Sequence, residues 1–196
     1  MNFLAHCTLA QPGDGFIAGG VLGDFVKGSI PASLPADLRA GIRLHRRIDS
    51  YSNHLPEMKV SVARFDPALR RAAPVLLDIL ADHCLTLTWG CYAEQDLAAF
   101  TARVYAAIET YRDRIPARGR DFVSRMVETD LLARYGDREV IERAMAHVLA
   151  RLRLDHLGDR LQPTLESDLP AFIDDFRVYF PLLRAFAAAE RADGPR

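Results

Sequence analysis

Apolar side chains recur every three or four residues along most of this chain, a spacing typical of helices rather than strands. Leu97, Phe100 and Val104 illustrate the pattern, and the helix-forming residues Ala, Leu and Arg dominate throughout. We therefore expect an all-α protein. The predicted helices span residues 35–51, 74–92, 94–114, 119–134, 137–152 and 168–190, and a further helix is predicted to start at Asp66-Pro67. Breaks are predicted at Ile115-Pro116, Gly136-Asp137, Gly158-Asp159 and Gln162-Pro163.

Length and charge narrow the class of protein further. A chain of 196 residues fits a single domain covering residues 1–196. Its formal net charge of -1 argues against a protein that binds nucleic acid or coats a membrane. Three cysteines without CxxC spacing, and an N-terminus unlike a signal peptide, favour a reduced, cytoplasmic compartment. The oligomeric state stays open.

Half of the 12 glycines lie between Gly13 and Gly28. The segment matches neither a GxGxxG motif nor a Walker loop, so close helix packing is at least as good an interpretation as phosphate binding. Asp24 lies inside this segment with apolar neighbours. It is either a surface residue on a helix or a buried acid that needs a partner.

The helix predicted from Pro35 carries the clearest chemical signal. Leu38 and Ile42 define its apolar face, and the same face continues through His45 and Asp49. A buried carboxylate needs a cation, a hydrogen-bond donor or a metal ion, and His45 lies one turn away. The alternative is a plain His-Asp pair beside a solvated arginine face.

The helix predicted from Pro74 carries a second signal. His83 falls on the apolar face of that helix, and Asp82 points about 100° away from it, so both could reach a point between their directions. Imidazole and carboxylate together suit manganese, iron or zinc. A buried, purely structural histidine is the alternative.

His6 lies in an apolar N-terminal run, where a structural role is again the alternative. Together these positions place three histidines and three aspartates, Asp24, Asp49 and Asp82, in the first 90 residues. The last hundred contain no similar set. Such a set predicts a metal site or acid–base chemistry.

Several motifs, in this order, resemble the acyl carrier protein phosphodiesterases. They are MNFLAH (1–6), GDFVKG (23–28), GIRLHRRID (41–49), LPE (55–57), APVLLDI (73–79), DHCL (82–85) with Trp89, RYGD (134–137) and YFP (179–181). The similarity covers nearly the whole chain, and the block from 41 to 49 is the most distinctive part.

The resemblance implies a single-domain helical bundle of the type found in HD phosphohydrolases. It also implies a divalent metal, usually Mn²⁺, with Mg²⁺ or Fe²⁺ as alternatives. The activity that the resemblance implies is hydrolysis of the phosphodiester between 4'-phosphopantetheine and a serine of acyl carrier protein. The implied metal ligands are His6, Asp24, His45, Asp82 and His83, and the implied catalytic residues are Asp24, His45, Arg46 and Asp49. The order Asp-His at 82–83 means that the ligand roles of the HD motif do not transfer by name.

The implied partner, acyl carrier protein, is small and acidic, so a basic docking surface is expected. The candidate residues are Arg39, Arg43, Arg47, Arg64, Arg70 and Arg71, with a solvated helix face as the alternative. Two other functions compete with the phosphodiesterase. One is a phosphohydrolase of the HD type acting on a nucleotide or another small phosphoester. The other is a non-catalytic module that binds a carrier protein.

Overall fold

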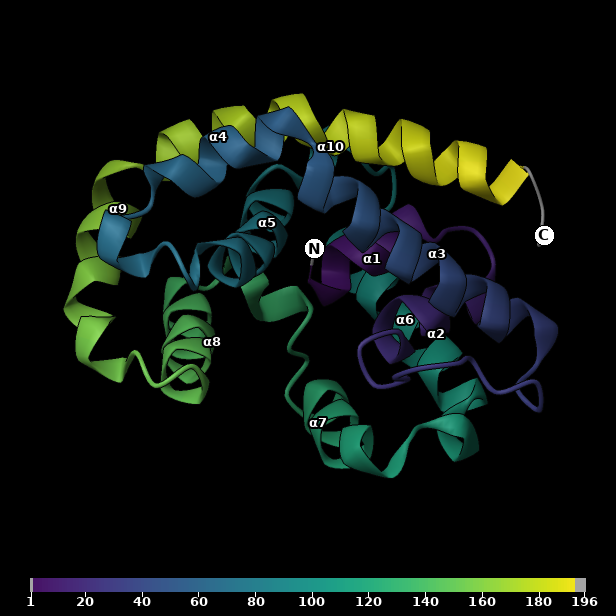
Figure 1. Ribbon diagram of the computed structural model, residues 1–196. Coiled ribbons are helices and arrows are strands. Elements are labelled where there is room, and N and C mark those ends of the chain that lie inside the picture. The colour runs from purple at the N-terminus through teal and green to yellow at the C-terminus, as the bar shows by residue number, and fades with distance from the viewer. Residues whose placement is uncertain (1, 193–196) are drawn as a thin grey trace.

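The computed structural model describes residues 2–192; Met1 and residues 193–196, which the predicted domain includes, lie outside the described residues. Within this range the chain forms one helical domain without strands, which confirms the all-α prediction. Figure 1 shows the arrangement. The α-helices are α1 (Phe3–Leu9), α2 (Asp14–Leu22), α3 (Ala36–His54), α4 (Pro56–Arg64), α5 (Ala73–Leu87), α6 (Leu97–Thr110), α7 (Ala117–Glu128), α8 (Arg138–Arg151), α9 (Leu161–Ser167) and α10 (Leu169–Ala192).

Five short 3₁₀ helices connect these elements. They are η1 (Pro67–Leu69), η2 (Trp89–Cys91), η3 (Arg112–Arg114), η4 (Ala133–Gly136) and η5 (Asp155–Arg160). No helix among the described residues is both long enough and apolar enough to cross a bilayer.

Several helix ends differ from the prediction for local reasons. α5 ends at Leu87 instead of Tyr92, because the backbone of Thr88 leaves the helical conformation (φ -116°, ψ 20°) and the chain turns into η2. α6 starts at Leu97 because Asp96 caps it, accepting a hydrogen bond from the Ala99 amide at 2.6 Å. Asp66 caps the helix predicted to start at Asp66-Pro67, which is the 3₁₀ helix η1 of three residues.

Four helices, α1, α2, α4 and α9, lie outside the predicted set. The predicted break at Gln162-Pro163 is wrong, because Pro163 lies in the first turn of α9, where a missing N–H costs no helical hydrogen bond. The predicted break at Gly158-Asp159 lies within η5.

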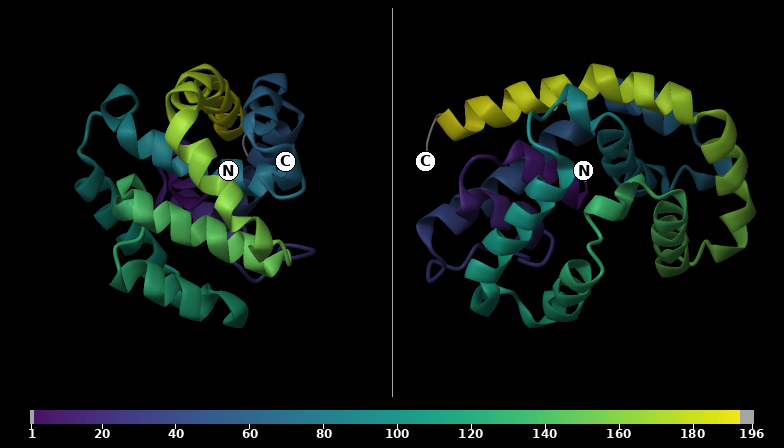
Figure 2. Two further views of the ribbon diagram at one scale, coloured as in Figure 1. Left: turned by 90° about the vertical axis from the view of Figure 1, so that its left-hand side faces the viewer. Right: turned by 180° about the vertical axis from the view of Figure 1, so that it is seen from behind.

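α10 is the longest helix and runs along one side of the molecule beside α4, α3 and α5 (Figures 1 and 2). Its inward face carries Phe172, Phe176, Tyr179 and Phe180, each at most 1% exposed. The Phe176 and Phe180 rings stack with centroids 4.7 Å apart. This aromatic face supplies much of the apolar core behind α3 and α5.

α2 packs between α3 and α6. The contact with α3 is close, because a Cβ on Gly19 would lie 2.5 Å from the Gly41 backbone, and one on Gly41 would lie 2.6 Å from the Gly15 carbonyl. For these residues the glycine-rich segment therefore serves helix packing, one of the two interpretations open from sequence. The close approach brings the end of α2 against His45.

Candidate metal centre

His45 lies on the inward face of α3 and is 3% exposed. Its Nδ1 lies 2.9 Å from the Gly20 carbonyl oxygen, and since a carbonyl only accepts, Nδ1 carries the donated proton. The imidazole fits against Gly23, where a Cβ would lie 2.3 Å from the ring. Glycines of α2 thus orient His45 so that Nε2 faces the carboxylates.

Those carboxylates come from two elements. Asp49, one turn along α3, places Oδ2 3.2 Å from His45 Nε2. Asp24 follows the end of α2, and its Oδ1 lies 3.7 Å from the same nitrogen. Both side chains remain partly exposed, at 38% for Asp49 and 42% for Asp24, so the centre opens to solvent on this side.

His6, from α1, completes the group from the buried side. Its Nε2 lies 3.0 Å from Asp49 Oδ1, and its ring stacks on the His45 ring with centroids 3.8 Å apart. The side chain is 1% exposed, and its Nδ1 is buried without a hydrogen-bond partner among the described residues.

This geometry suits a metal ion. His6, His45 and Asp49 each offer a ligand atom, and these atoms lie within 4.8 Å of one another. Ligand atoms about 2.0–2.2 Å from a shared ion would lie at comparable separations. The Gly20 carbonyl fixes the His45 tautomer, as outer-shell partners of metal-bound histidines do. The donor set therefore fits a divalent ion, and in the described chain this is the one such group of three or more side chains.

The electrostatics point the same way. Burial, followed by the neighbouring His45, lowers the pKa of His6 to about 4. Burial also disfavours charge on His45, but hydrogen bonds to Asp24 and Asp49 outweigh it and raise the pKa of His45 to about 9. Although burial opposes it, hydrogen bonding to His45 lowers the pKa of both carboxyl groups. The metal-free centre thus holds two carboxylates against one imidazolium, that of His45, and a divalent ion would neutralise the remaining negative charge.

A pocket of about 210 Å³ lies against this group. It is lined by Gly23, Asp24, Val26, Lys27, Gly28, His45, Arg46 and Asp49. Cationic side chains from Lys27 and Arg46 beside carboxylate and imidazole form a setting suited to a phosphoester.

Asp82 and His83 are both buried on α5, as predicted, but neither belongs to the group around His45. The Asp82 carboxylate accepts hydrogen bonds from the Leu4 and Ala5 amides, both at 2.9 Å. It thereby caps the N-terminus of α1, the helix that carries His6. Burial outweighs these two bonds and raises the pKa of Asp82 to about 7.

His83 points to a different neighbour. Its Nδ1 donates to the Tyr135 carbonyl oxygen at 2.7 Å, and burial lowers the pKa of His83. The two adjacent side chains on α5 therefore serve separate contacts, to α1 and to η4.

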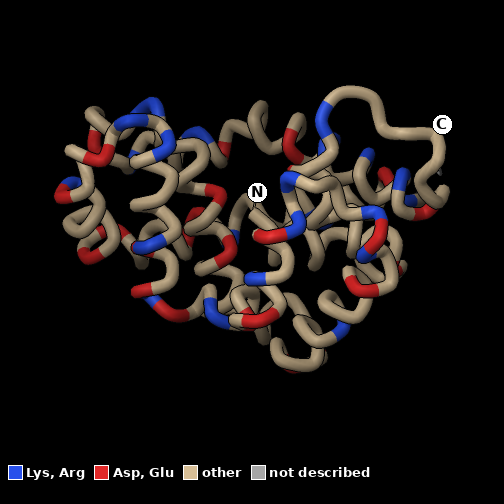
Figure 3. Tube along the Cα trace, turned by 90° about the horizontal axis from the view of Figure 1, so that it is seen from below, with Lys and Arg blue, Asp and Glu red and all other residues tan. Residues whose placement is uncertain are grey.

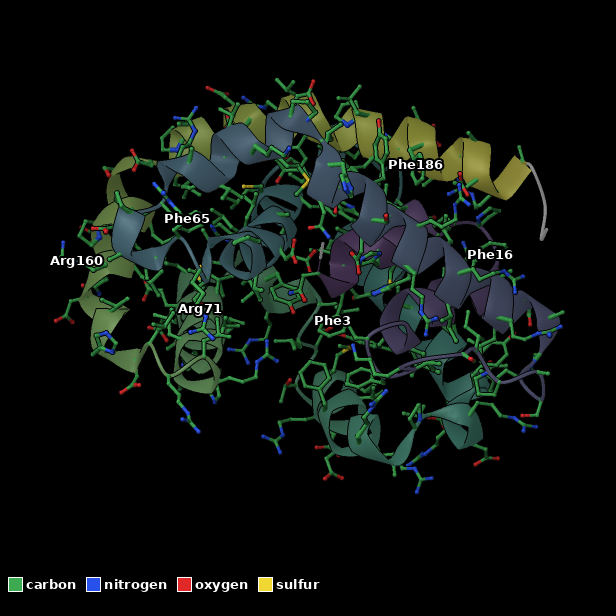
Figure 4. All side chains as sticks on the ribbon, viewed as in Figure 1. Phe3, Phe16, Phe65, Arg71, Arg160 and Phe186 are labelled. Carbon is green, nitrogen blue, oxygen red and sulfur yellow. The ribbon has the colours of Figure 1, made fainter. Side chains whose placement is uncertain are left out.

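The predicted arginines are spread over the molecule. Arg46 donates to two backbone carbonyls of the segment that follows α2. Arg47 pairs with Glu190 of α10 and Arg64 with Asp175, so both already have anionic partners. Arg39 and Arg43 lie on α3, whereas Arg70 and Arg71, the latter labelled in Figure 4, precede α5.

Sequence reasoning missed Gly20, Gly23 and Arg118 as parts of this site. The glycine-rich stretch was the available signal for the first two. Arg118, on α7, donates a hydrogen bond to the carbonyl of Phe25, the residue after Asp24. The two residues are 93 positions apart in the sequence, so no local pattern predicts this contact.

Fold and site together define a helical protein with a histidine–carboxylate centre of the kind that binds divalent ions. The model of the family described as "Acyl carrier protein phosphodiesterase" matches residues 1–183. The chain belongs to this family, which confirms the resemblance found in its motifs.

Two similar relatives carry that same name. The Enterobacter sp. (strain 638) protein is 33% identical over 183 residues, covering 92% of this chain and 94% of its own. The Salmonella dublin protein is 34% identical over 190 residues, covering 96% of this chain and 98% of its own. No solved structure matches the chain significantly.

Proposed function

We propose that this chain is a metal-dependent phosphodiesterase that converts holo-acyl carrier protein to its apo form. Water would add to the phosphorus, the bond from phosphorus to the serine oxygen would break, and that oxygen would take a proton. The products are 4'-phosphopantetheine and the free serine hydroxyl. The observation that carries the proposal is the convergence of His6, His45 and Asp49 beside an accessible pocket.

His6, His45 and Asp49 would hold the ion, with Asp24 beside them. A divalent ion there would supply an activated water and compensate charge on the phosphoryl oxygens. The protein's own contribution is orientation, because Gly20 fixes the His45 ring and Asp82 anchors the helix that carries His6. Mn²⁺, with Mg²⁺ or Fe²⁺ as alternatives, remains our proposal for the ion.

We also propose that the fold is related to the HD phosphohydrolases. Support comes from the all-helical architecture and from a histidine–aspartate centre contributed by different helices. The cytoplasmic location proposed from sequence is supported by Cys7, Cys84 and Cys91, which are all free thiols.

For the acidic carrier protein we propose docking at Arg39 and Arg43. Both lie on α3, the helix of His45, whereas Arg47 and Arg64 are already paired. Figure 3 shows positive and negative residues interspersed along the chain without one dominant sign, so docking would depend on local charge rather than on an overall field. Charge reversal at Arg39 and Arg43 together should raise KM, with the effect shrinking at high salt.

The test is mass spectrometry of purified holo-acyl carrier protein after incubation with this protein and Mn²⁺. Wild type should remove the phosphopantetheine mass, a chelator should prevent this, and Asp24→Ala should be inactive. His147→Ala is the matched control, because His147 is exposed on α8 away from the centre. Unchanged carrier protein, with Mn²⁺ bound and free nucleotides hydrolysed, would favour the small-phosphoester alternative. Tight carrier binding without turnover or bound metal would favour the non-catalytic module.

A further inference from the structure

Asp24 lies on a segment with little regular structure of its own. Helix α2 ends at Leu22, and the chain then turns through hydrogen bonds from the Phe25 and Val26 amides to the Leu22 carbonyl, at 2.9 and 3.0 Å. At Gly28 the backbone adopts a positive φ of 69°, a conformation that favours glycine. The position of Asp24 therefore depends on contacts from outside the segment.

Two arginines from other helices supply those contacts. Arg46 of α3 donates from Nη1 to the Gly28 carbonyl at 2.8 Å and from Nη2 to the Val26 carbonyl at 2.6 Å. Arg118 of α7 donates from Nε to the Phe25 carbonyl at 2.7 Å. Three of the four carbonyls that follow Asp24 up to Gly28 are thus bound by guanidinium groups.

The side chain of Phe25 is also held by α7. Its ring lies 5.7 Å from the Phe122 ring, centroid to centroid, and a Cβ on Gly119 would come within 2.6 Å of it. The Phe3 ring of α1 stacks on the Phe25 ring at 6.3 Å. The residue after Asp24 is therefore fixed through both its carbonyl and its ring.

We infer that Arg46 and Arg118 are positioning residues that place Asp24 beside the metal centre, and that Arg46 is not primarily a phosphate ligand. Arg46 follows His45 directly on α3, so its two hydrogen bonds tie the Asp24 segment to the helix that carries His45 and Asp49. Three of its five N–H groups remain for other contacts, but the guanidinium is already oriented by the backbone. The inference rests on the proposed function, on its metal centre for the Mn²⁺ readout and on its reaction for the activity readout.

A double-mutant cycle on Mn²⁺ affinity, measured by calorimetry, tests this inference. Arg46→Ala should weaken Mn²⁺ binding about 10- to 100-fold, the range for outer-shell partners of metal ligands. The double variant with Asp24→Ala should bind Mn²⁺ no more weakly than Asp24→Ala alone. Arg46→Lys should give an intermediate loss, because one ammonium group cannot hold two carbonyls in a fixed fork. Arg143→Ala, an exposed arginine of α8, is the control and should match wild type.

Kinetics separate positioning from phosphate binding. Positioning predicts that Arg46→Ala lowers kcat on holo-acyl carrier protein and leaves KM nearly unchanged. A raised KM with unaltered Mn²⁺ affinity would overturn the inference and make Arg46 a direct phosphate ligand. So would fully additive effects in the cycle.

A second variant and the activity assay separate the positioning role of the arginines from the proposed function. Arg118→Ala, on a different helix, should reproduce the loss of Mn²⁺ affinity and carries the test if Arg46→Ala fails to fold. If the Mn²⁺ cycle behaves as expected but holo-acyl carrier protein is not converted, the proposed function fails and the positioning role stands. A wild type that binds no Mn²⁺ would overturn both.

Discussion

The two halves of the molecule bury very different side chains. Up to Cys91 the interior contains His6, His45, Asp82 and His83, each at most 3% exposed. From Leu97 to Ala192 the buried polar side chains other than tyrosines are Thr101 and Thr164. The Thr101 hydroxyl bonds to the Ala98 carbonyl within α6, and the Thr164 hydroxyl bonds to the Arg160 carbonyl at the end of η5. The second half instead buries the aromatic face of α10.

This contrast separates function from support. Burying an ionisable group is costly unless it is paired. The buried ionisable groups of the first half therefore contribute less to the free energy of unfolding than apolar side chains in their place would. The second half keeps its charges at the surface, as in the ion pair of Arg177 and Asp174. Changes in the first half should therefore reduce activity more than stability, and changes in the second half should do the reverse.

The largest expected effect is on activity in the first half. Asp49→Asn keeps the shape of the side chain but removes the charge that faces both histidines, so we expect kcat to fall about 10²- to 10⁴-fold. Thermal unfolding should change little by comparison. A variant that retains most of its activity would remove Asp49 from the centre and break the contrast.

The matching change in the second half acts on stability. Phe176 is fully buried, so Phe176→Ala should cost about 3–5 kcal/mol in the free energy of unfolding, measured with denaturant. The folded fraction should keep its kcat, because Phe176 belongs to α10 and not to the centre. Loss of kcat in fully folded protein would show that α10 takes part in the chemistry.

A smaller change tests the fit between α2 and His45. In Gly23→Ala the new methyl group would lie 2.3 Å from the imidazole and displace it, so Mn²⁺ affinity should fall about tenfold or more. Gly90→Ala is the matched control, because no atom lies within 4 Å of the added Cβ. Equal Mn²⁺ affinities of the two variants would mean that the orientation of His45 does not depend on Gly23.

The smallest effect concerns the pH dependence of the metal-free protein. The folded-state pKa of His45 is raised from 6.5 to about 9. The stabilisation that protonated His45 adds to the free energy of unfolding is therefore fully present below pH 6.5 and is lost as pH rises toward 9. We expect a loss on the order of 2 kcal/mol over that range, with a chelator present. The depressed pKa of His6 acts in the opposite sense, lowering stability as pH falls from 6.5 to about 4.

Denaturant titrations from pH 6.5 to 9 should therefore show the stability of the metal-free protein falling as pH rises, and the raised pKa of Asp82, about 7, acts in the same direction at the acidic end of this range. Asp49→Asn should flatten the alkaline side, because one of the two carboxylates that raise the pKa of His45 is then neutral. A wild-type profile that stays flat from pH 6.5 to 9 would contradict the charge arrangement described for this centre.

Local patterns predicted much of this fold. The helix expected at 35–51 is α3, and the four-residue spacing of His45 and Asp49 does place them in contact. The same reasoning put Asp82 and His83 in the interior, where both lie. Short helices such as α1 and α2 gave too few periodic positions to be recognised.

What the sequence could not predict is which distant elements meet. His6 reaches Asp49 across 43 residues, and Asp82 reaches the Leu4 amide across 78. These contacts depend on how α1 packs against α3 and α5, and periodicity only reports which face of each helix is buried. For the same reason the contacts of Arg46 could not be predicted. Its guanidinium binds the segment that follows α2, and the periodicity of α3 carries no information about that segment.

Diffraction at the manganese absorption edge, from crystals soaked in Mn²⁺, would decide whether His6, His45 and Asp49 bind the catalytic ion as proposed. We expect an anomalous peak within bonding distance of all three side chains, on the pocket side near Asp24. A peak bound instead by Asp82 and His83, with His6 and Asp49 remote from it, would show that the metal centre lies elsewhere.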